Sequence, residues 1–241
     1  MKNTDLRYYS DSYQFLDTAK VVDIYAENNG RYAIVLDGTI MYPQGGGQPY
    51  DTGEIITKGV VFRVKEVRFK DGVVYHIGSF VTGIFTIGDT VDVSINEPRR
   101  RLHARLHTAG HLIDQVLREL HLGLQPVKGF HFPEGAYVEY RGTYSADLAL
   151  LAKEIERILN LLIATDALVT SEIVDSIEAL KKRGVTIPIA ISANKSVRIV
   201  SALEPMPCGG THVKRLGEVG YVQIPKVRIK DSNLRISYRL S

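Results

Sequence analysis

The stretch that most constrains the fold is residues 101–120, RLHARLHTAGHLIDQVLREL. Its apolar residues recur close to helical spacing, which predicts a helix. His107 and His111 stand four residues apart, so on a helix both imidazoles project from one face, one turn apart. At this spacing a helix can offer two nitrogen ligands to one metal ion. The spacing also fits ordinary core or surface histidines, because His103 extends the series by one more turn.

A second motif, PCGGTH at residues 207–212, favours the metal interpretation. Cys208 is the only cysteine of the chain and stands four residues before His212, with two glycines between them that let the backbone bend. Two imidazoles from a helix, with a thiolate and an imidazole from a Gly-rich turn, form a ligand set that suits zinc. We therefore predict a zinc site made of His107, His111, Cys208 and His212.

Cysteine usage and hydropathy indicate the compartment. A single cysteine allows no internal disulfide, which fits a reducing environment. The first ten residues, MKNTDLRYYS, are polar and lack the apolar core of a signal peptide. No apolar run approaches the roughly 18 residues that a membrane helix needs. We expect a cytoplasmic protein with no membrane partner; the sequence does not indicate its oligomeric state.

The fold class is predicted to be α+β, in two domains. Residues 1–95 contain short strand-like runs, with a turn signal at Lys70-Asp71-Gly72, and their spacing predicts a small antiparallel β-barrel that includes a Gly-rich motif. Pro98 is well placed to start the helix described above. Residues 96–241 are predicted to form an α+β domain, a sheet with helices against it. Its expected helices are 146–165, with Ser145 as N-cap, and 176–183. Its expected strands are 131–141, around a turn at residues 133–135, and 168–174, 197–201, 220–224 and 234–238.

The Gly-rich motif, residues 41–53, reads MYPQGGGQPYDTG. Three consecutive glycines place no side chains between the backbone and its surroundings, so their amides can approach a phosphate or another chain segment closely. The motif is not a Walker loop, because no Gly-Lys-Ser/Thr follows. Composition alone favours a flexible loop or a bulge, although Gln44, Gln48 and Asp51 are unusual for a plain linker.

Basic residues concentrate at the C-terminal end, although the net charge of the whole chain is only +3. From Lys181 onward there are twelve Lys and Arg residues against three acidic ones, which favours a polyanionic partner such as nucleic acid. A solvated surface is the plainer alternative, and an edge strand made soluble by its charges is another. The candidate nucleic-acid contacts are Lys181, Lys182, Arg183, Lys214, Arg215, Lys226, Arg228 and Lys230.

The three motifs together resemble a known family. The segment His107-Thr-Ala-Gly-His111 followed by Cys208-Gly-Gly-Thr-His212 is similar to the paired zinc motifs of the alanyl-tRNA editing domain, and the Gly-rich motif is similar to the segment preceding that domain in alanyl-tRNA synthetases. No aminoacylation core precedes them, so we expect a free-standing protein of the AlaX type. The resemblance implies a β-barrel followed by a zinc-bearing editing domain. It also implies hydrolysis of tRNA for alanine that is mischarged, chiefly with serine and with glycine as a second candidate, in support of translation fidelity.

The resemblance also assigns roles to residues. It carries zinc binding, and catalysis through zinc, to His107, His111, Cys208 and His212. It places Gly45, Gly46, Gly47 and Gln48 near the editing site. An editing pocket that hydrogen-bonds the serine hydroxyl refuses correct alanyl-tRNA, which would leave that pocket group unpaired. Thr108 is expected to point away from the face shared by the helical ligands. We expect a strand near the site to line the pocket with Gln125, Lys128 and His131. The sequence supports a purely structural role for these three residues about equally well.

The residue pattern leaves the mechanism open. Zinc can activate a water, polarise the ester carbonyl or orient the substrate. Four protein ligands close a zinc site, so either one ligand is loose, with His212 as our candidate, or zinc expands its shell, or the water is held elsewhere.

Two alternatives to editing are considered. The first is a non-catalytic module that binds tRNA or other nucleic acid and is stabilised by a structural zinc. Two observations argue against it: two of the ligands lie on a long helix, and the chain is large enough to have its own core. The second is another zinc hydrolase of small esters or amides. The chain lacks the His-Glu-x-x-His pattern of metalloproteases, because Thr108 stands where Glu would be.

Overall fold

The structure is a computed structural model that describes residues 3–174 and 197–241. The chain divides into two compact units, one of residues 1–45 with 49–102 and the other of residues 46–48 with 103–241. This division differs from a boundary at residue 95. It falls inside the first long helix, and it groups Gly46–Gln48 with the second unit, because the contacts of Gly47 and Gln48 are made there. Each unit is described by itself.

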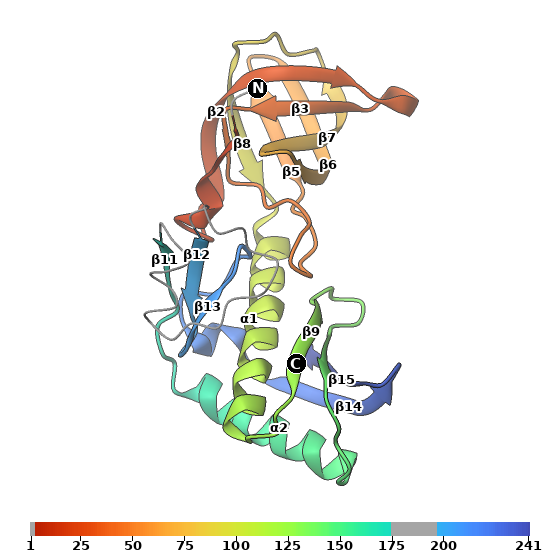
Figure 1. Ribbon diagram of the computed structural model, residues 1–241. Helices are drawn as coiled ribbons and strands as arrows, with labels where there is room; N and C mark the ends of the chain where they lie inside the picture. Colours follow the sequence, from red (N-terminus) through yellow and green to blue (C-terminus); the bar gives the residue numbers. More distant parts are fainter. Residues whose placement is uncertain (1–2, 175–196) are drawn as a thin grey trace. The chain divides into compact units, whose positions relative to one another are not determined.

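The first unit contains a closed six-stranded barrel, which confirms the predicted antiparallel barrel (Figure 1). Every neighbouring pair of its strands is antiparallel. The barrel order is β2 (Leu16–Ala26), β3 (Tyr32–Leu36), β7 (Val73–Thr82), β6 (Val60–Lys70), β5 (Gly53–Thr57) and β8 (Thr90–Ile95). Outside it lie the parallel pair β1 (Asp5–Leu6) and β4 (Gly38–Thr39) and the short helices η1 (Arg7–Tyr9) and η2 (Asn28–Gly30).

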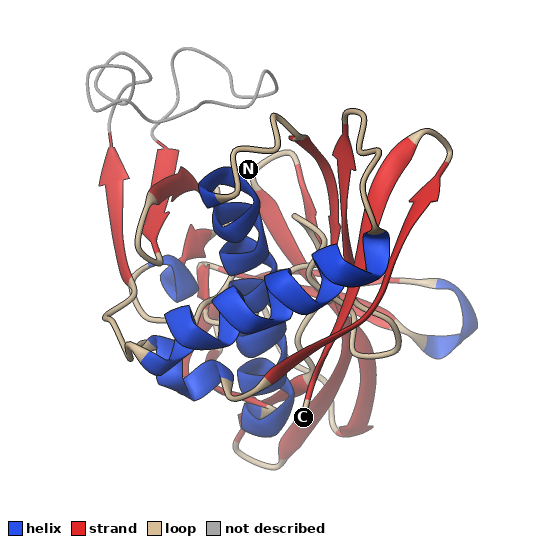
Figure 2. Ribbon diagram, turned by 90° about the horizontal axis from the view of Figure 1, so that it is seen from below, coloured by secondary structure: helices blue, strands red, loops and turns tan. Residues whose placement is uncertain are grey.

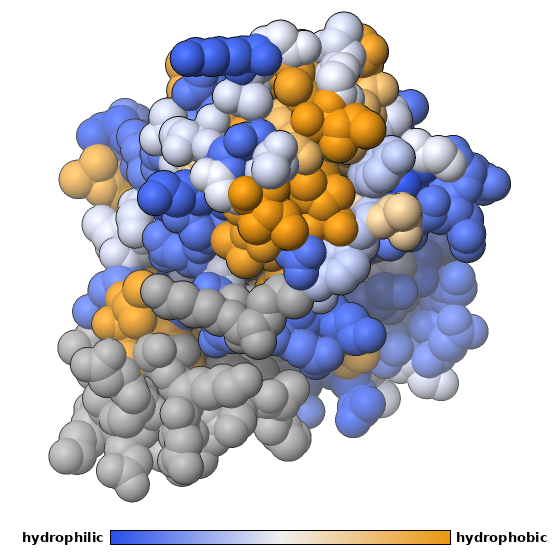
Figure 3. Space-filling view, turned by 90° about the horizontal axis from the view of Figure 1, so that it is seen from above, coloured by the Kyte–Doolittle hydropathy of each residue, from blue (hydrophilic) through white to orange (hydrophobic). Residues whose placement is uncertain are grey.

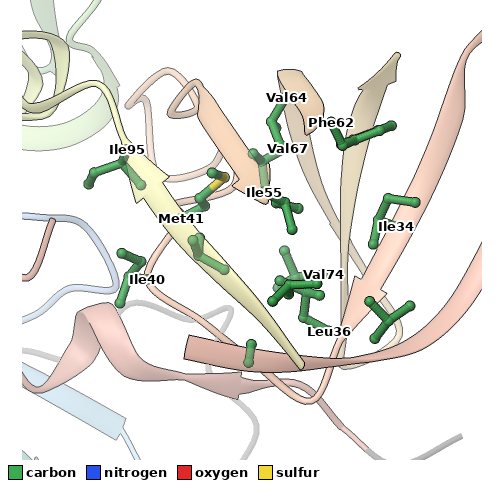
Figure 4. Packing of buried hydrophobic residues seen from close by; sticks show 14 of the residues in the cluster. Ile34, Leu36, Ile40, Met41, Ile55, Phe62, Val64, Val67, Val74 and Ile95 are labelled. Carbon is green, nitrogen blue, oxygen red and sulfur yellow. The ribbon is translucent and has the colours of Figure 1, made fainter. Parts of the chain in front are cut away.

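Alternating side chains of the strands fill the barrel interior (Figure 4). On β6, Phe62 and Val64 point inward, and then a register shift between Val64 and Glu66 changes the alternation so that Val67 is the next buried residue. The turn at Asp71 and Gly72 joins β6 to β7 as predicted; both residues have positive φ, 51° and 82°, as a two-residue hairpin turn requires.

Not every large apolar side chain of the first unit is inside. Val81, Ile84 and Ile87 are each more than half exposed. Figure 3 shows hydrophobic side chains gathered in one area of the face that it views.

The second unit combines helices with two sheets, which confirms the α+β class (Figure 2). Helix α1 (Glu97–Glu119) runs into it from the first unit. A four-stranded sheet has the order β14-β15-β10-β9, and a three-stranded sheet has the order β11-β12-β13. The bounds are β9 (Gln125–Phe130), β10 (Tyr137–Arg141), α2 (Leu148–Ala164), β11 (Thr170–Val174), β12 (Val197–Ser201), β13 (Pro205–Pro207), η3 (Leu216–Val219), β14 (Val222–Lys230) and β15 (Asn233–Leu240).

Helix α2 covers the outer strand β14. Asn160 donates to the carbonyl of Val222 at 2.8 Å and accepts from its amide at 2.9 Å, and Glu156 accepts from the amide of Ile224 at 2.7 Å. Side chains of the helix thus take the place of a neighbouring strand at this edge of the sheet. The buried stripe of the helix is Leu151, Ile155, Leu159 and Ile163.

Several predicted boundaries were wrong. The N-cap of α2 is Asp147 and not Ser145, since the Asp147 carboxylate accepts from the amides of Ala149 and Leu150. The strand predicted at 131–141, around a turn at residues 133–135, begins only at Tyr137 as β10; the turn is present, and residues 131–136 connect β9 to β10. The helix predicted at 176–183 lies outside the described residues. Among the described residues, no helix combines the length and the apolarity that crossing a membrane requires.

Candidate metal centre

The four predicted ligand residues come together in the second unit. One ligand atom from each of His107, His111, Cys208 and His212 lies within 4.8 Å of the others. Helix α1 supplies the first two, and the turn that follows β13 supplies the other two. The imidazole Nε2 atoms of His107 and His212 lie 3.4 Å and 3.3 Å from the sulfur of Cys208. This cluster can hold a metal ion.

The second of the two glycines after Cys208 is required by close packing. A Cβ atom on Gly210 would lie 2.1 Å from Cε1 of His107, so no other residue fits there without moving the ring. The amide of Gly210 donates to the sulfur of Cys208 at 3.3 Å. Arg198 donates to the carbonyls of Cys208 and Gly210, at 3.1 Å and 2.8 Å, and holds the turn in place. Arg198 was not singled out from the sequence.

Gln48 of the Gly-rich motif fixes the tautomer of His107. Its side-chain oxygen lies 2.8 Å from Nδ1 of His107 and also accepts from the amide of Thr211, while its nitrogen donates to the Thr211 hydroxyl. An amide oxygen only accepts, so Nδ1 of His107 carries the proton and donates it. The lone pair of Nε2 is thereby directed toward Cys208, as a metal ligand requires.

Thr108 plays the corresponding part for His212. Its hydroxyl donates to the carbonyl of Ala104 at 2.8 Å, one helical turn earlier, so its oxygen accepts from Nδ1 of His212 at 3.1 Å. The amide of Val213 donates to the same oxygen at 3.3 Å. Although Thr108 was expected to point away from the face of His107 and His111, its hydroxyl reaches the ring of His212 in the same cluster. The sequence analysis missed this role.

His131 packs against the cluster. Its ring stacks on that of His107, with centroids 4.6 Å apart and planes 24° apart, and its Nδ1 lies 2.5 Å from the Tyr238 hydroxyl. That hydroxyl donates to the carbonyl of Leu106, so it accepts from His131. Gly110, in the helical motif, leaves room for this ring, because a Cβ there would lie 2.4 Å from Cε1 of His131. Tyr238 and Gly110 were not predicted.

Burial sets the protonation of the cluster. Removal from water lowers the pKa of His111 to about 3 and that of His131 to about 4, and it lowers the pKa values of His107 and His212 well below the usual range. The imidazoles are therefore neutral, which is the form that binds metal. Burial also raises the pKa of the Cys208 thiol to about 11, so only a nearby cation would make a thiolate stable at neutral pH.

Comparison with known proteins shows which proteins the chain resembles. A family model of tRNA synthetases class II (A) matches residues 2–99. The chain is 34% identical, over 94% of its length, to an alanyl-tRNA editing protein AlaX-L of Pyrococcus horikoshii. Over most of its length the chain is therefore similar to an alanyl-tRNA editing protein. It is also 33% identical to an alanine–tRNA ligase of Methanococcoides burtonii and 32% identical to one of Haloquadratum walsbyi, over 85% and 93% of this chain. It spans 55% of the AlaX-L protein and 23% and 24% of the two ligases.

The Gly-rich motif serves both units of this chain. Gly46 and Gly47 have positive φ, 51° and 77°, and a Cβ on Gly47 would lie 2.3 Å from the carbonyl oxygen of Gly129. The carbonyl of Gly47 accepts from the amide of His131 at 2.8 Å. Gly45 belongs to the first unit, where its carbonyl accepts from the Tyr42 hydroxyl at 2.9 Å.

The other candidate residues lie elsewhere in the chain. Gln125 and Lys128 pair across the sheet with Arg141 and Glu139, on the face that does not carry His131. Arg215 is paired with Asp166 at 2.6 Å. Lys214 is exposed beside it, and Lys226, Arg228 and Lys230 share one face of β14. Lys181, Lys182 and Arg183 lie outside the described residues.

Proposed function

We propose that this protein is a trans-editing hydrolase that deacylates tRNA for alanine mischarged with serine, with glycine as a second substrate, at a zinc ion. The carrying observation is that two motifs about a hundred residues apart bring four ligand atoms within 4.8 Å, in a homologue of alanyl-tRNA editing proteins. In this proposal residues 1–95 act as a barrel domain and residues 96–241 as the editing domain. The editing domain is completed by Gly46–Gln48 and binds tRNA through its basic residues, among them Lys214, Arg215 and Lys226.

The donor set supports zinc. Three imidazoles and one thiol are the ligands that zinc takes in proteins. Nδ1 of His111 is buried and has no hydrogen-bond partner among the described residues. The lone pairs of His107 and His212 face the sulfur of Cys208 with no positive group between them. Buried acceptors that face one another are stabilised by a shared cation.

When bound, zinc supplies Lewis-acid chemistry, by polarising the ester carbonyl or lowering the pKa of a water. The residues of the chain orient and retain it. Gln48 and Thr108 hold protons on the outer nitrogens of His107 and His212, and Cys208 contributes the negative charge. A reactive site needs a ligand that yields. The hydrogen bond from His212 to Thr108 argues against His212. His111 is the less constrained ligand, because neither nitrogen of its ring makes a hydrogen bond among the described residues.

Selectivity for serine requires a pocket group that hydrogen-bonds the hydroxyl. Correct alanyl-tRNA would leave that group unpaired, which disfavours its binding in the transition state. His131 lies against the cluster and is the candidate that we retain from the sequence. Gln125 and Lys128 lie on the opposite face of the sheet, so they do not contribute to this pocket in our proposal.

The test measures deacylation of seryl-tRNA for alanine beside alanyl-tRNA, with and without a zinc chelator. We expect fast loss of serine, sparing of alanine, and sensitivity to the chelator. His111→Ala should abolish hydrolysis, whereas His121→Ala, the same change at an exposed histidine after α1, should not. Tight tRNA binding with no hydrolysis of either ester would instead favour the zinc-stapled binding module, which a closed set of four ligands also fits.

A further inference from the structure

The outward face of the four-stranded sheet is defined by its strand register. Residues directly opposite one another on neighbouring strands share a face. One row across β9, β10, β15 and β14 is Lys128, Glu139, Arg235 and Arg228, and the next is Phe130, Tyr137, Ser237 and Lys226. A third row is Gln125, Arg141, Asn233 and Lys230. We call these twelve residues the outward sheet face.

This face is strongly basic. It carries six cationic side chains and one acidic one, Glu139, which is paired with Arg235 at 2.6 Å. No ion pair of the other five is found among the described residues. The cationic residues are Lys128, Arg141, Lys226, Arg228, Lys230 and Arg235. Such a surface attracts a polyanion.

A column of stacked aromatic rings stands at one end of the same face. Phe130 stacks on Tyr137 with centroids 5.1 Å apart and planes 19° apart, and Phe132 stacks on Phe130 at 4.3 Å and 11°. The guanidinium of Arg235 lies 4.0 Å from the centre of the Tyr137 ring and covers that end of the column. Among the described residues, the ring of Phe132 contacts no other ring than Phe130, so the column can be extended there by another flat ring.

The column lies beside the metal cluster. Phe130 and Phe132 flank His131, which points to the opposite side and stacks on His107. β9 is the last strand in the order of this sheet, so only one strand edge separates the column from the cluster. β9, β15 and β14 can be followed in Figure 1. A single-stranded nucleic acid that lies on the outward sheet face can turn around the edge of β9 toward the metal ligands.

We propose that the outward sheet face binds the unpaired 3′ end of the tRNA, with a base stacked on Phe132 and phosphates beside Lys128, Lys226 and Arg228. Aromatic platforms with basic residues around them are how proteins hold single-stranded RNA without reading its sequence. The inference rests on the proposed function for the identity of the RNA. It explains why aromatic and basic residues share one exposed sheet face next to the ester-cleaving cluster.

The test measures binding of uncharged tRNA for alanine, full length and lacking its unpaired 3′ nucleotides, to the full chain. Phe132→Ala should weaken binding of the full-length tRNA by about tenfold, while Phe132→Trp should not, because a ring remains to stack. Neither change should affect the truncated tRNA. Phe69→Ala, the same substitution at an exposed phenylalanine of β6, is the matched control. Lys128→Glu, at an exposed position that does not endanger folding, should give a similar loss and a weaker dependence on salt.

Equal binding of the full-length tRNA by wild type and by both the Phe132→Ala and Lys128→Glu variants would overturn the proposal. So would an equal loss for the truncated tRNA, since the face would then bind the paired stem or serve another partner. Because uncharged tRNA undergoes no hydrolysis, this outcome is independent of the proposed activity. Failure to cleave seryl-tRNA, with the 3′-dependent binding intact, would contradict the proposed function alone.

Discussion

Two buried polar clusters, one in each unit, differ in whether they are complete. In the first unit the fully buried guanidinium of Arg100 donates to both carboxylate oxygens of Asp51 and to the carbonyls of Ser12 and Ile40. Asp51 also accepts from the amide of Tyr42 at 2.7 Å. Positive and negative charge cancel inside this cluster, and each donor has an acceptor. It therefore needs no ligand, and its role is to hold the ends of the Gly-rich motif.

The cluster in the second unit is satisfied only on its outside. Gln48 and Thr108 bind the outer nitrogens of His107 and His212, but the inner atoms of all four ligand residues are acceptors or a thiol that converge on one another. The difference teaches how to separate a structural polar core from a binding site. Where donors and acceptors match, the cluster is structural; where acceptors converge, the cluster can hold a cation.

The largest effect is expected from removing the sulfur ligand. Cys208→Ala should lose bound zinc and deacylation together, because three neutral imidazoles lack the negative charge that the thiolate supplies. Metal content by atomic absorption and hydrolysis of seryl-tRNA measure the two losses. Cys208→Ser, which keeps the size but is a poorer zinc ligand, should lie between Ala and wild type. Full activity of Cys208→Ala without metal would remove the distinction between the two clusters.

Removing the charge partner in the complete cluster should act on stability instead. Asp51→Ala leaves Arg100 buried without its counter-ion and should lower the free energy of unfolding by about 3–5 kcal/mol. Asp92→Ala, at an exposed position of β8, is the control and should change it by less than about 0.5 kcal/mol. Urea unfolding, with and without chelator, measures both. A loss for Asp51→Ala that depends on the chelator would show that this cluster, too, involves a metal.

A buried histidine of the barrel extends the comparison to pH. His76 donates from Nδ1 to the carbonyl of Ile34 and accepts at Nε2 from the Thr39 hydroxyl. Both of its ring nitrogens thus have a hydrogen-bond partner without a metal. Burial lowers its pKa from 6.5 to about 4. The unfolded chain then binds the proton more readily, so the stabilisation is present above pH 6.5 and is lost as the pH falls toward 4, by up to about 3 kcal/mol.

The variant His76→Gln measures this contribution. Its free energy of unfolding should fall less steeply than that of wild type between pH 6.5 and 4.5, because glutamine does not titrate. His121→Gln, at an exposed site, should keep the wild-type slope. Parallel curves for wild type and His76→Gln would mean that His76 is protonated as easily in the barrel as in the unfolded chain.

What the sequence predicts depends on how local the signal is. The four ligand residues and the barrel were predicted because helical spacing, a unique cysteine and regular strand spacing are local patterns. The partners of the ligands were not, because Arg198, Thr108 and Tyr238 contact the cluster across a fold that spacing does not encode. Gln48 was placed near the site only by resemblance, and its contact with His107 joins residues 59 apart.

The smallest effect, and the sharpest test of the comparison, is expected at Gln48. It stands three positions before Asp51 in the same Gly-rich motif, yet each serves a different cluster. Gln48→Ala removes the group that fixes the tautomer of His107 and should weaken zinc affinity by about 10- to 100-fold, with little loss of stability when zinc is saturating. Gln48→Glu keeps an acceptor for Nδ1 and should retain most of the affinity. Competition with a chromogenic zinc chelator measures the affinity, and urea unfolding at saturating zinc measures the stability. The contrary outcome is that Gln48→Ala lowers stability as much as Asp51→Ala and leaves zinc affinity unchanged. Gln48 would then belong to a structural core, and the cluster of the second unit would not depend on it to bind a cation.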